Sequence, residues 1–528
     1  MFYNYYDNYQ YDSCISKGIC SINPRTSSLR EVLVMYLKLL AYYTIQLKHL
    51  GIKNNAAENI ILDSLSGLMS NLESGNEQFY KILINLRTII TKSMYIYKKT
   101  CREKNLRPKE INSNIKLNKN LNISDLIQLG EKEFLLKLKS LTDKQKNLYE
   151  IIFLVLKSIC INLVELKSFN IDDCCAYSEI LYLLNTLNYP ELSSEILLKK
   201  INRAIETDYC LNKKLYDIKQ EKYGVQTEAQ VSYSTRANKA ILVTGTNIQE
   251  LKNMLDAARN TDIDIYTHGE MIIAYTYPIF NTYPHLMGQF GKGLEHCLLD
   301  FAAFPGAILV AKHSLENIEY LYRGRLFTTD NFVPQGVIKI KENDYIPVIN
   351  SALNAKGFKH GQIRESFAIG CSQDYFDEKM NCLIHNMHNY KRIIIIGTQE
   401  HTKELKAYFD NLIKCLDDRT VVISLSEKHN AKNFIHINSA PDFYMIYRIF
   451  DRIKDFAKKN GTEIVLFIAK CDKHTISNIL NLKRLGLDRI YLSECTPISF
   501  NPALTRTLEE VFDIRKTTYV TQDIKLFE

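Results

Sequence analysis

The feature that most constrains the fold of this chain is a change in hydrophobic periodicity near Ala237. Before this point, apolar residues recur at the three- and four-residue spacing of amphipathic helices. After it, short runs rich in Ile and Val alternate with single helix-like segments, which is typical of parallel strands covered by helices on both faces. The sequence therefore predicts an N-terminal helical bundle domain followed by two α/β domains with parallel sheets.

The first predicted domain, residues 1–220, is helical almost throughout. The segment Ser28–Gly51 has helical spacing and ends in a glycine, which suits the position just after a helix. Polar segments at residues 106–122 and 221–238 are predicted to be connectors. The further predicted helices are Glu58–Leu72, Asn76–Lys99, Asp143–Ser168 and Asp172–Leu187.

The α/β domains are predicted at residues 237–355 and 356–528. In open parallel sheets, ligands bind at the carboxyl ends of the strands, so functional residues are expected directly after the strand runs. The predicted strands are Lys239–Gly245, Ile263–Met271, Ala307–Ser314, Arg392–Gln399, Thr420–Glu427, Glu463–Lys470 and Arg489–Glu494. The helices between the later strands are predicted at Thr402–Leu416, Asp442–Lys459, Thr475–Leu485 and Pro502–Phe512.

Composition narrows the class of protein. The net charge of +8 is spread thinly over 528 residues without a basic block, which argues against nucleic-acid binding. The first residues lack the apolar core of a signal peptide, and the most apolar segment, Ile151–Leu163, is interrupted by Lys157. Thirteen cysteines in so long a chain do not form the framework of a small secreted domain. We expect a soluble cytoplasmic protein that binds neither nucleic acid nor a membrane.

Two common ligand motifs are incomplete. The strand ends at Gly245 and Gly397 carry one glycine each, and no phosphate-binding loop follows them, so dinucleotide binding is not expected. His268-Gly-Glu270 has the H-x-E form of zinc deaminases but lacks the accompanying P-C-x-x-C pair. A polar turn is therefore the simpler interpretation of His268 and Glu270.

The cysteines divide into two groups. Cys174 and Cys175 are adjacent on a predicted helix and are expected to be buried core residues. Cys14 and Cys20 lie close together around a glycine and could provide half of a metal site, since iron–sulfur and structural zinc sites normally need four ligands.

Several segments together resemble one known family, the hybrid cluster proteins or prismanes, whose members are usually described as hydroxylamine reductases. The likeness covers nearly the whole chain. It implies a helical domain followed by two α/β domains, in agreement with the periodicity. The segments that carry it are KAILVTGTNIQELKNMLDAARNTDIDIYTHGEM, FPGAILVAKHS, LFTTD, IIIIGTQE, TVVISLSE, LFIAKCDK and RIYLSECTPISFNPALTRTLEEVF.

The resemblance implies a 4Fe-4S cubane held by cysteines near the N-terminus. The matching positions here hold Tyr3, Tyr6, Cys14 and Cys20. A tyrosine phenol has a pKa of about 10 and is a poor substitute for a thiolate in iron–sulfur chemistry. The cysteine motif is therefore degenerate.

The resemblance also implies a hybrid iron–sulfur–oxygen cluster between the domains. Thr246 stands at the implied histidine position, Glu270 and Cys471 stand at the glutamate positions, and the cysteine positions hold Ser314, Gln399, Glu427 and Ala440. Only Glu270 keeps the implied ligand, so neither cluster is expected to assemble. We expect these residues to surround one cavity, with Glu270 and Glu427 less than about 15 Å apart.

Three functions follow as hypotheses. The first is a family member without clusters or reductase activity that acts as a binding or scaffold protein with a protein partner. The second is the implied family reaction, reduction of hydroxylamine to ammonia and water with electrons from a redox partner. The third is a pocket in which Glu270, Glu427 and Cys471, with His268 or His313, hold a single zinc or iron ion.

Overall fold

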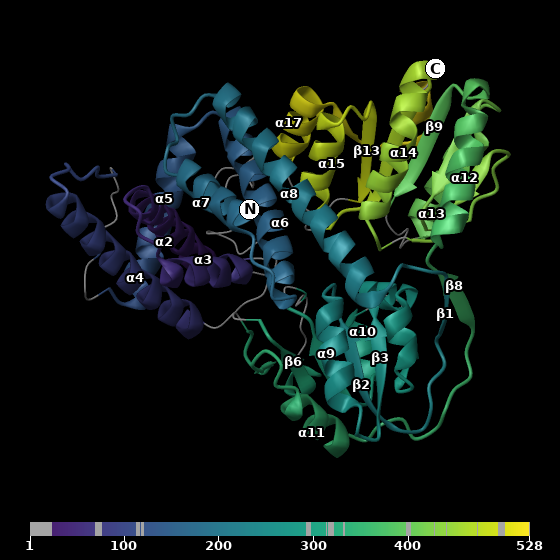
Figure 1. Cartoon of the computed structure of the whole chain (residues 1–528), viewed down its shortest axis with the longest axis horizontal. Helices are drawn as coiled ribbons and strands as arrows, with labels where there is room; N and C mark the ends of the chain where they lie inside the picture. Colours follow the sequence, from purple (N-terminus) through teal and green to yellow (C-terminus); the bar gives the residue numbers. More distant parts are fainter. Residues whose placement is uncertain are drawn as a thin grey trace. The chain divides into compact units, whose positions relative to one another are not determined.

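The computed structural model describes most of the chain, in two compact units (Figure 1). One unit comprises Met1–Leu211 and Ile308–Pro347, and the other comprises Asn212–Ala307 and Val348–Glu528. The three-domain boundaries expected from the sequence stay a prediction. The described residues are 24–68, 76–111, 117, 121–291, 297–312, 314, 321–330, 333–397, 403–426, 428–439, 441–472, 474–494 and 502–526.

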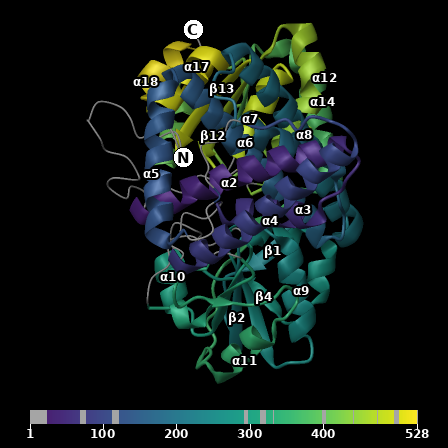
Figure 2. The same cartoon turned by 90° about the vertical axis from the view of Figure 1, so that its left-hand side faces the viewer.

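The helical part of the chain is built around α2 (Pro24–His49). Almost every residue of α2 from Thr26 onward is buried, including the charged Arg30 and Glu31. Figure 2 shows α2 among the helices it packs against, which are α3, α4, α5 and α7. The further helices are α3 (Asn55–Gly67), α4 (Asn76–Glu103), α5 (Ile123–Ser140), α6 (Asp143–Ser168), α7 (Cys174–Thr186) and α8 (Ser194–Tyr223). The described residues from 24 to 223 contain no strand, which confirms the prediction of an all-helical first part.

Local sequence signals set several helix ends. Helix α6 begins after Thr142, whose hydroxyl accepts the Gln145 N–H while the Gln145 side chain accepts the Thr142 N–H. This reciprocal arrangement satisfies backbone donors that have no partner within the helix. Beyond the end of α2, Gly51 has a φ of +81°, the left-handed conformation that its place in the sequence predicted.

The first predicted set of strands forms a six-stranded sheet with the order β4-β3-β2-β5-β6-β7. Within this sheet, the neighbouring strands β2 and β3 run parallel and place Thr244 opposite His268. Helix α9 (Ile248–Ala258) follows β2 and is capped by the Asn247 side chain. The strands are β2 (Lys239–Thr244), β3 (Ile263–His268), β4 (Leu286–Gln289), β5 (Ala307–Val310), β6 (Leu326–Thr328) and β7 (Ile338–Lys339).

The C-terminal part forms a second parallel sheet with the order β11-β10-β9-β12-β13-β14. All residues of β9 are buried, so both of its faces are covered, because successive side chains point to opposite faces. Its Ile394 and Ile396 pack with Phe409 of α13 (Lys403–Lys414), which Figure 1 shows near this sheet. The strands are β9 (Arg392–Gly397), β10 (Thr420–Ser424), β11 (Phe434–His436), β12 (Glu463–Lys470), β13 (Arg489–Glu494) and β14 (Ile514–Lys516). The later helices are α14 (Tyr444–Asn460), α15 (Thr475–Arg484) and α17 (Pro502–Phe512).

Two features of the fold differ from or add to the expectations. A two-stranded antiparallel sheet joins β1 (Ala229–Ser232) to β8 (Ser366–Ile369), segments far apart in the sequence. The expected burial of Cys174 and Cys175 is wrong, since both thiols are exposed in the first turn of α7. The helix buries its apolar face through later residues such as Ile180 and Leu184.

No described helix is both long enough and apolar enough to span a bilayer.

Candidate functional site

The described residues of the expected pocket all follow parallel strands. Thr246 comes shortly after β2, Glu270 after β3, Ser314 after β5 and Cys471 directly after β12. Because Thr244 and His268 are paired across β2 and β3, Thr246 and Glu270 lie beyond the same edge of the first sheet, at matching positions.

The other expected residues lie outside the part of the chain that the structure describes. The common cavity and the separation of Glu270 from Glu427 therefore stay predictions. The residues concerned are Tyr3, Tyr6, Cys14, Cys20, His313, Gln399, Glu427 and Ala440.

The described pocket residues differ in environment. Thr246 is exposed in the bend between β2 and α9, whereas Glu270 is half-buried in the 3-10 turn η2 (Gly269–Thr276). Ser314 is half-buried, and its N–H donates to the Ala311 carbonyl at 3.0 Å. Cys471 is half-buried.

His268 is fully buried, and both of its ring nitrogens have partners. Its Nδ1 lies 3.1 Å from the Thr244 hydroxyl, and its Nε2 lies 3.2 Å from Oδ2 of Asp300. A histidine can bind a metal only through a ring nitrogen that is free to face it. The geometry thus supports the simpler interpretation of His268 as a satisfied buried histidine that anchors the end of β3.

A second polar cluster holds the turn that carries Glu270. The Thr267 hydroxyl donates to Oε1 of Gln289 at 2.5 Å, and Nε2 of Gln289 donates to the Gly269 carbonyl at 3.1 Å. Gly269 itself has a φ of +60°, a conformation that glycine adopts without steric cost. These contacts fix the backbone of the turn that places Glu270 beyond the edge of the sheet.

Comparison with known proteins gives the family. The model of the Prismane/CO dehydrogenase family matches residues 10–426. The chain belongs to the prismane/CO dehydrogenase family. It is also 23% identical over 535 aligned residues to a protein of Rhodospirillum rubrum named hydroxylamine reductase, with 97% of this chain and 96% of that protein covered.

The described donor set does not fit a thiolate-held cluster of the kind that the prismane resemblance implies. Thr246 and Ser314 offer hydroxyl groups in place of a histidine and a cysteine. Iron–sulfur clusters require soft thiolate ligands, which hydroxyl groups do not replace. Among the described residues there is also no group of three or more His, Cys, Asp or Glu side chains that could hold a metal ion.

The structure brings out a set of serines, of which the sequence indicated only Ser439, as an alternative to Ala440 under a small shift in register. Four serine hydroxyls near the carboxyl ends of the second sheet's strands are buried and have no hydrogen-bond partner among the described residues: Ser426 after β10, Ser439 after β11, Ser477 in the first turn of α15 and Ser493 in β13. The Ser439 backbone is held near β10, because its N–H donates to the Leu425 carbonyl at 3.0 Å. No sequence signal could have identified the burial of these hydroxyls, because serine is common in turns and burial depends on the tertiary fold.

Proposed function

We propose that this chain is a prismane-family protein that acts by binding, as a partner or scaffold protein, without iron–sulfur clusters or reductase activity. One observation carries the proposal. Where the resemblance implies cluster ligands, the described Thr246 and Ser314 supply hydroxyls, and Cys471 stands in place of a carboxylate. The remaining positions, Gln399, Glu427 and Ala440, lack thiols.

The chemistry of the family reaction explains why these replacements matter. Cleaving the N–O bond of hydroxylamine consumes two electrons and two protons. Protein side chains can donate and accept protons but cannot store electrons, so a cofactor must supply them. Without thiolates to hold iron and sulfide, the retained Glu270 can bind or orient a polar molecule but cannot reduce it.

The buried serine hydroxyls support a binding role, because they lie near the carboxyl ends of parallel strands, where ligands bind in such sheets. Leaving a buried polar group without a hydrogen bond costs about 1–3 kcal/mol. Ser439, Ser477 and Ser493 are at most 7% exposed, and their hydroxyls have no hydrogen-bond partner within the described part of the chain. A bound polar group at the sheet edge that accepted hydrogen bonds from them would recover part of this cost.

Hydroxylamine reduction is the second candidate function. It is favoured by the alignment with the Rhodospirillum rubrum protein, which covers 97% of this chain and includes both sheets. This candidate requires that residues other than the implied ligands hold the clusters.

Anaerobic reconstitution distinguishes the two functions. The full chain and the Rhodospirillum rubrum hydroxylamine reductase are treated in parallel with ferrous iron and sulfide, desalted and assayed with hydroxylamine and reduced viologen. We expect this chain to stay colourless, to retain no iron or sulfide and to show no turnover above the blank. A brown protein with turnover near that of the relative, abolished by Glu270→Ala, would overturn the proposal.

A further inference from the structure

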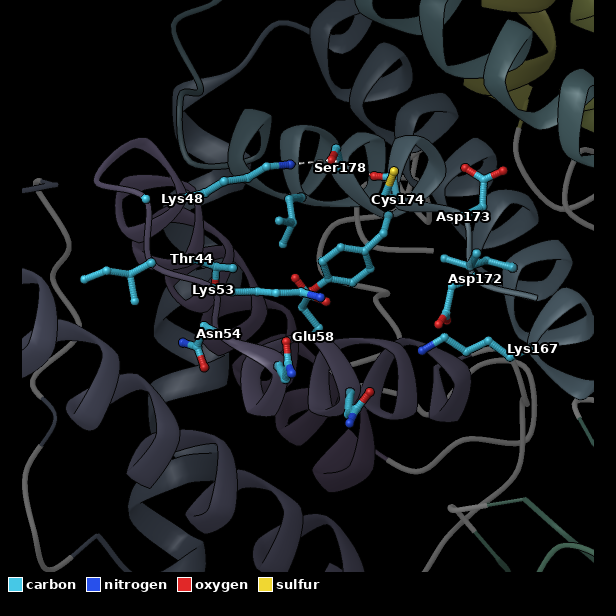
Figure 3. Close-up of a pocket in the computed structure, with 17 residues that line it drawn as sticks. Thr44, Lys48, Lys53, Asn54, Glu58, Lys167, Asp172, Asp173, Cys174 and Ser178 are labelled. Atoms are coloured by element: carbon cyan, nitrogen blue, oxygen red, sulfur yellow. Dashed lines mark hydrogen bonds between the residues drawn. The ribbon is translucent and has the colours of Figure 1, made fainter. Parts of the chain in front are cut away.

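The helical unit contains a cavity of about 520 Å³. It lies where the connection between α2 and α3 faces the connection between α6 and α7, with walls from the adjoining turns of those four helices. Figure 3 shows the polar and charged side chains that surround it, among them Lys53, Glu58, Lys167 and Asp172. Its size falls in the range of about 300–1,000 Å³ that is typical of small-molecule sites.

Tyr177 of α7 lines this cavity, and its hydroxyl group has no hydrogen-bond partner within the described part of the chain. The residue is only 8% exposed, and its oxygen is buried. Buried tyrosine hydroxyls usually find a partner, so the free one marks a position where a ligand group would be favourable. Burial, with a smaller contribution from the Glu58 carboxylate, raises the pKa of Tyr177, so the hydroxyl remains protonated at neutral pH. It can therefore both donate and accept a hydrogen bond.

The charged side chains around the cavity fall into two groups. Lys48 donates to the Ser178 hydroxyl at 2.7 Å, and Asp173 accepts the Ala176 N–H at 3.0 Å as the cap of α7. In contrast, four others make no ion pair or side-chain hydrogen bond within the described part of the chain: Lys53, Glu58, Lys167 and Asp172. The cavity thus offers uncommitted charges of both signs.

We propose that this cavity binds a small zwitterion of the α-amino acid class. The carboxylate of the ligand pairs with the ammonium group of Lys53 or Lys167, and its ammonium group pairs with Glu58 or Asp172. A polar group of the ligand that reaches the Tyr177 hydroxyl completes the polar contacts. This site lies within the helical unit and does not depend on the function proposed for the strand ends.

Titration calorimetry of the full chain tests the ligand class. The probes are the twenty L-amino acids, each compared with the analogue that lacks the amino group and the amine that lacks the carboxylate; for alanine these are propionate and ethylamine. We expect at least one amino acid to bind with a Kd below about 1 mM and both of its analogues to bind at least tenfold more weakly. Absence of binding by every amino acid at roughly 10 mM, or equal binding of an analogue, would overturn the proposal.

Two substitutions locate the bound amino acid. Tyr177→Phe removes only the hydroxyl and is expected to weaken binding by about 2- to 10-fold. Lys53→Met is expected to weaken it further, because it removes a charge. The matched control is Lys199→Met, which changes an exposed lysine of α8 outside the cavity and should leave the Kd unchanged. Unchanged affinity in both cavity variants would overturn the assignment of the site.

Alkylation of Cys174 provides a readout that needs no substitution. Cys174 lines the cavity and is exposed, whereas Cys210 of α8 is exposed outside it. We expect the bound amino acid to slow the reaction of Cys174 with iodoacetamide while Cys210 reacts at its usual rate, as followed by peptide mass spectrometry. Equal rates at Cys174 with and without saturating amino acid would contradict binding in this cavity.

Discussion

Arg236 and Asp264, in the second unit, form an ion pair whose partners differ in exposure. The Asp264 side chain on β3 is 1% exposed, whereas that of Arg236 is 52% exposed. Nε of Arg236 donates to Asp264 at 2.6 Å, and a second guanidinium nitrogen completes a two-pronged contact. A buried carboxylate is tolerated when its charge is compensated in this way.

We predict that Arg236→Ala lowers the free energy of unfolding by about 3 kcal/mol, because it leaves the buried Asp264 carboxylate without its cation. Urea unfolding followed by circular dichroism measures the change. Lys199→Ala is the control, since Lys199 pairs with Glu195 at an exposed site and should cost less than about 0.5 kcal/mol. Equal losses in the two variants would show that burial of Asp264 does not matter.

Asp442 gives a prediction about pH. Burial raises the pKa of this carboxyl group, although the positive charges of Lys219 and Arg448 act in the opposite direction. A raised folded-state pKa means that the folded protein binds the proton more tightly than the unfolded chain. Stability linked to this group is therefore complete below the unfolded pKa of about 3.9 and is lost as pH rises through the folded-state value.

Asp442→Asn is expected to be more stable than the parent protein at neutral pH, with a difference that disappears as the pH falls toward about 4. The asparagine keeps the oxygen that accepts the Tyr444 N–H at 3.0 Å, so the start of α14 is preserved. Urea unfolding of both proteins across this pH range provides the test. A stability gain that grows on acidification would contradict the sign of the pKa shift.

At the scale of elements, helix ends depend on single residues whose conformation matters more than their contacts. Gly461 ends α14 with a φ of +67°, and its N–H donates to carbonyls in the last turn. A Cβ atom at this position would meet no atom within 4 Å. Any cost of replacing Gly461 therefore comes from the backbone conformation and not from a clash.

We predict that Gly461→Ala lowers the free energy of unfolding by about 1 kcal/mol. Gly324→Ala is the matched control, because a Cβ there also has open space but the backbone does not have a positive φ. That variant should be neutral or slightly stabilising, since alanine restricts the unfolded chain. Thermal unfolding compares the two, and a loss in Gly324→Ala as large as in Gly461→Ala would argue against a conformational cause.

At the scale of the whole molecule, the chain forms two compact units whose boundaries do not follow the order of the sequence. Residues Ile308–Pro347 group with the helical unit, although the chain enters them directly from β-sheet segments of the other unit. Chains of this size commonly unfold through intermediates, with each compact unit melting cooperatively.

We expect calorimetry to resolve two transitions, although β5, β6 and β7 share a sheet with β2, β3 and β4 and so couple the units in part. Leu33→Ala creates a cavity beside α2, and Leu466→Ala creates one beside β12; both side chains are fully buried. Each substitution should cost its own unit about 2–5 kcal/mol and lower one transition more than the other. A single transition that both substitutions lower equally would contradict independent melting of the units.

The sequence alone determined the main helices and strands, and it indicated the carboxyl edge of each sheet as the place to expect a site. The predicted helix Asp143–Ser168 matches α6, and the predicted strands Glu463–Lys470 and Arg489–Glu494 match β12 and β13. Hydrophobic periodicity is a local property and reports which faces a segment buries. The placement of Thr246 and Glu270 could also be predicted locally, because each residue comes shortly after a strand run. The structure shows that these two strands are parallel neighbours.

Only the tertiary structure decided the properties that depend on residues far apart in the chain. The pairing of β1 with β8 and the exposure of Cys174 and Cys175 have no local signature. The same is true of the Ser439 and Tyr177 hydroxyls, which have no hydrogen-bond partner among the residues that the structure describes. Burial and hydrogen bonding are set by what packs against a side chain, and a hydrophobic pattern specifies which face is covered but not which atoms cover it.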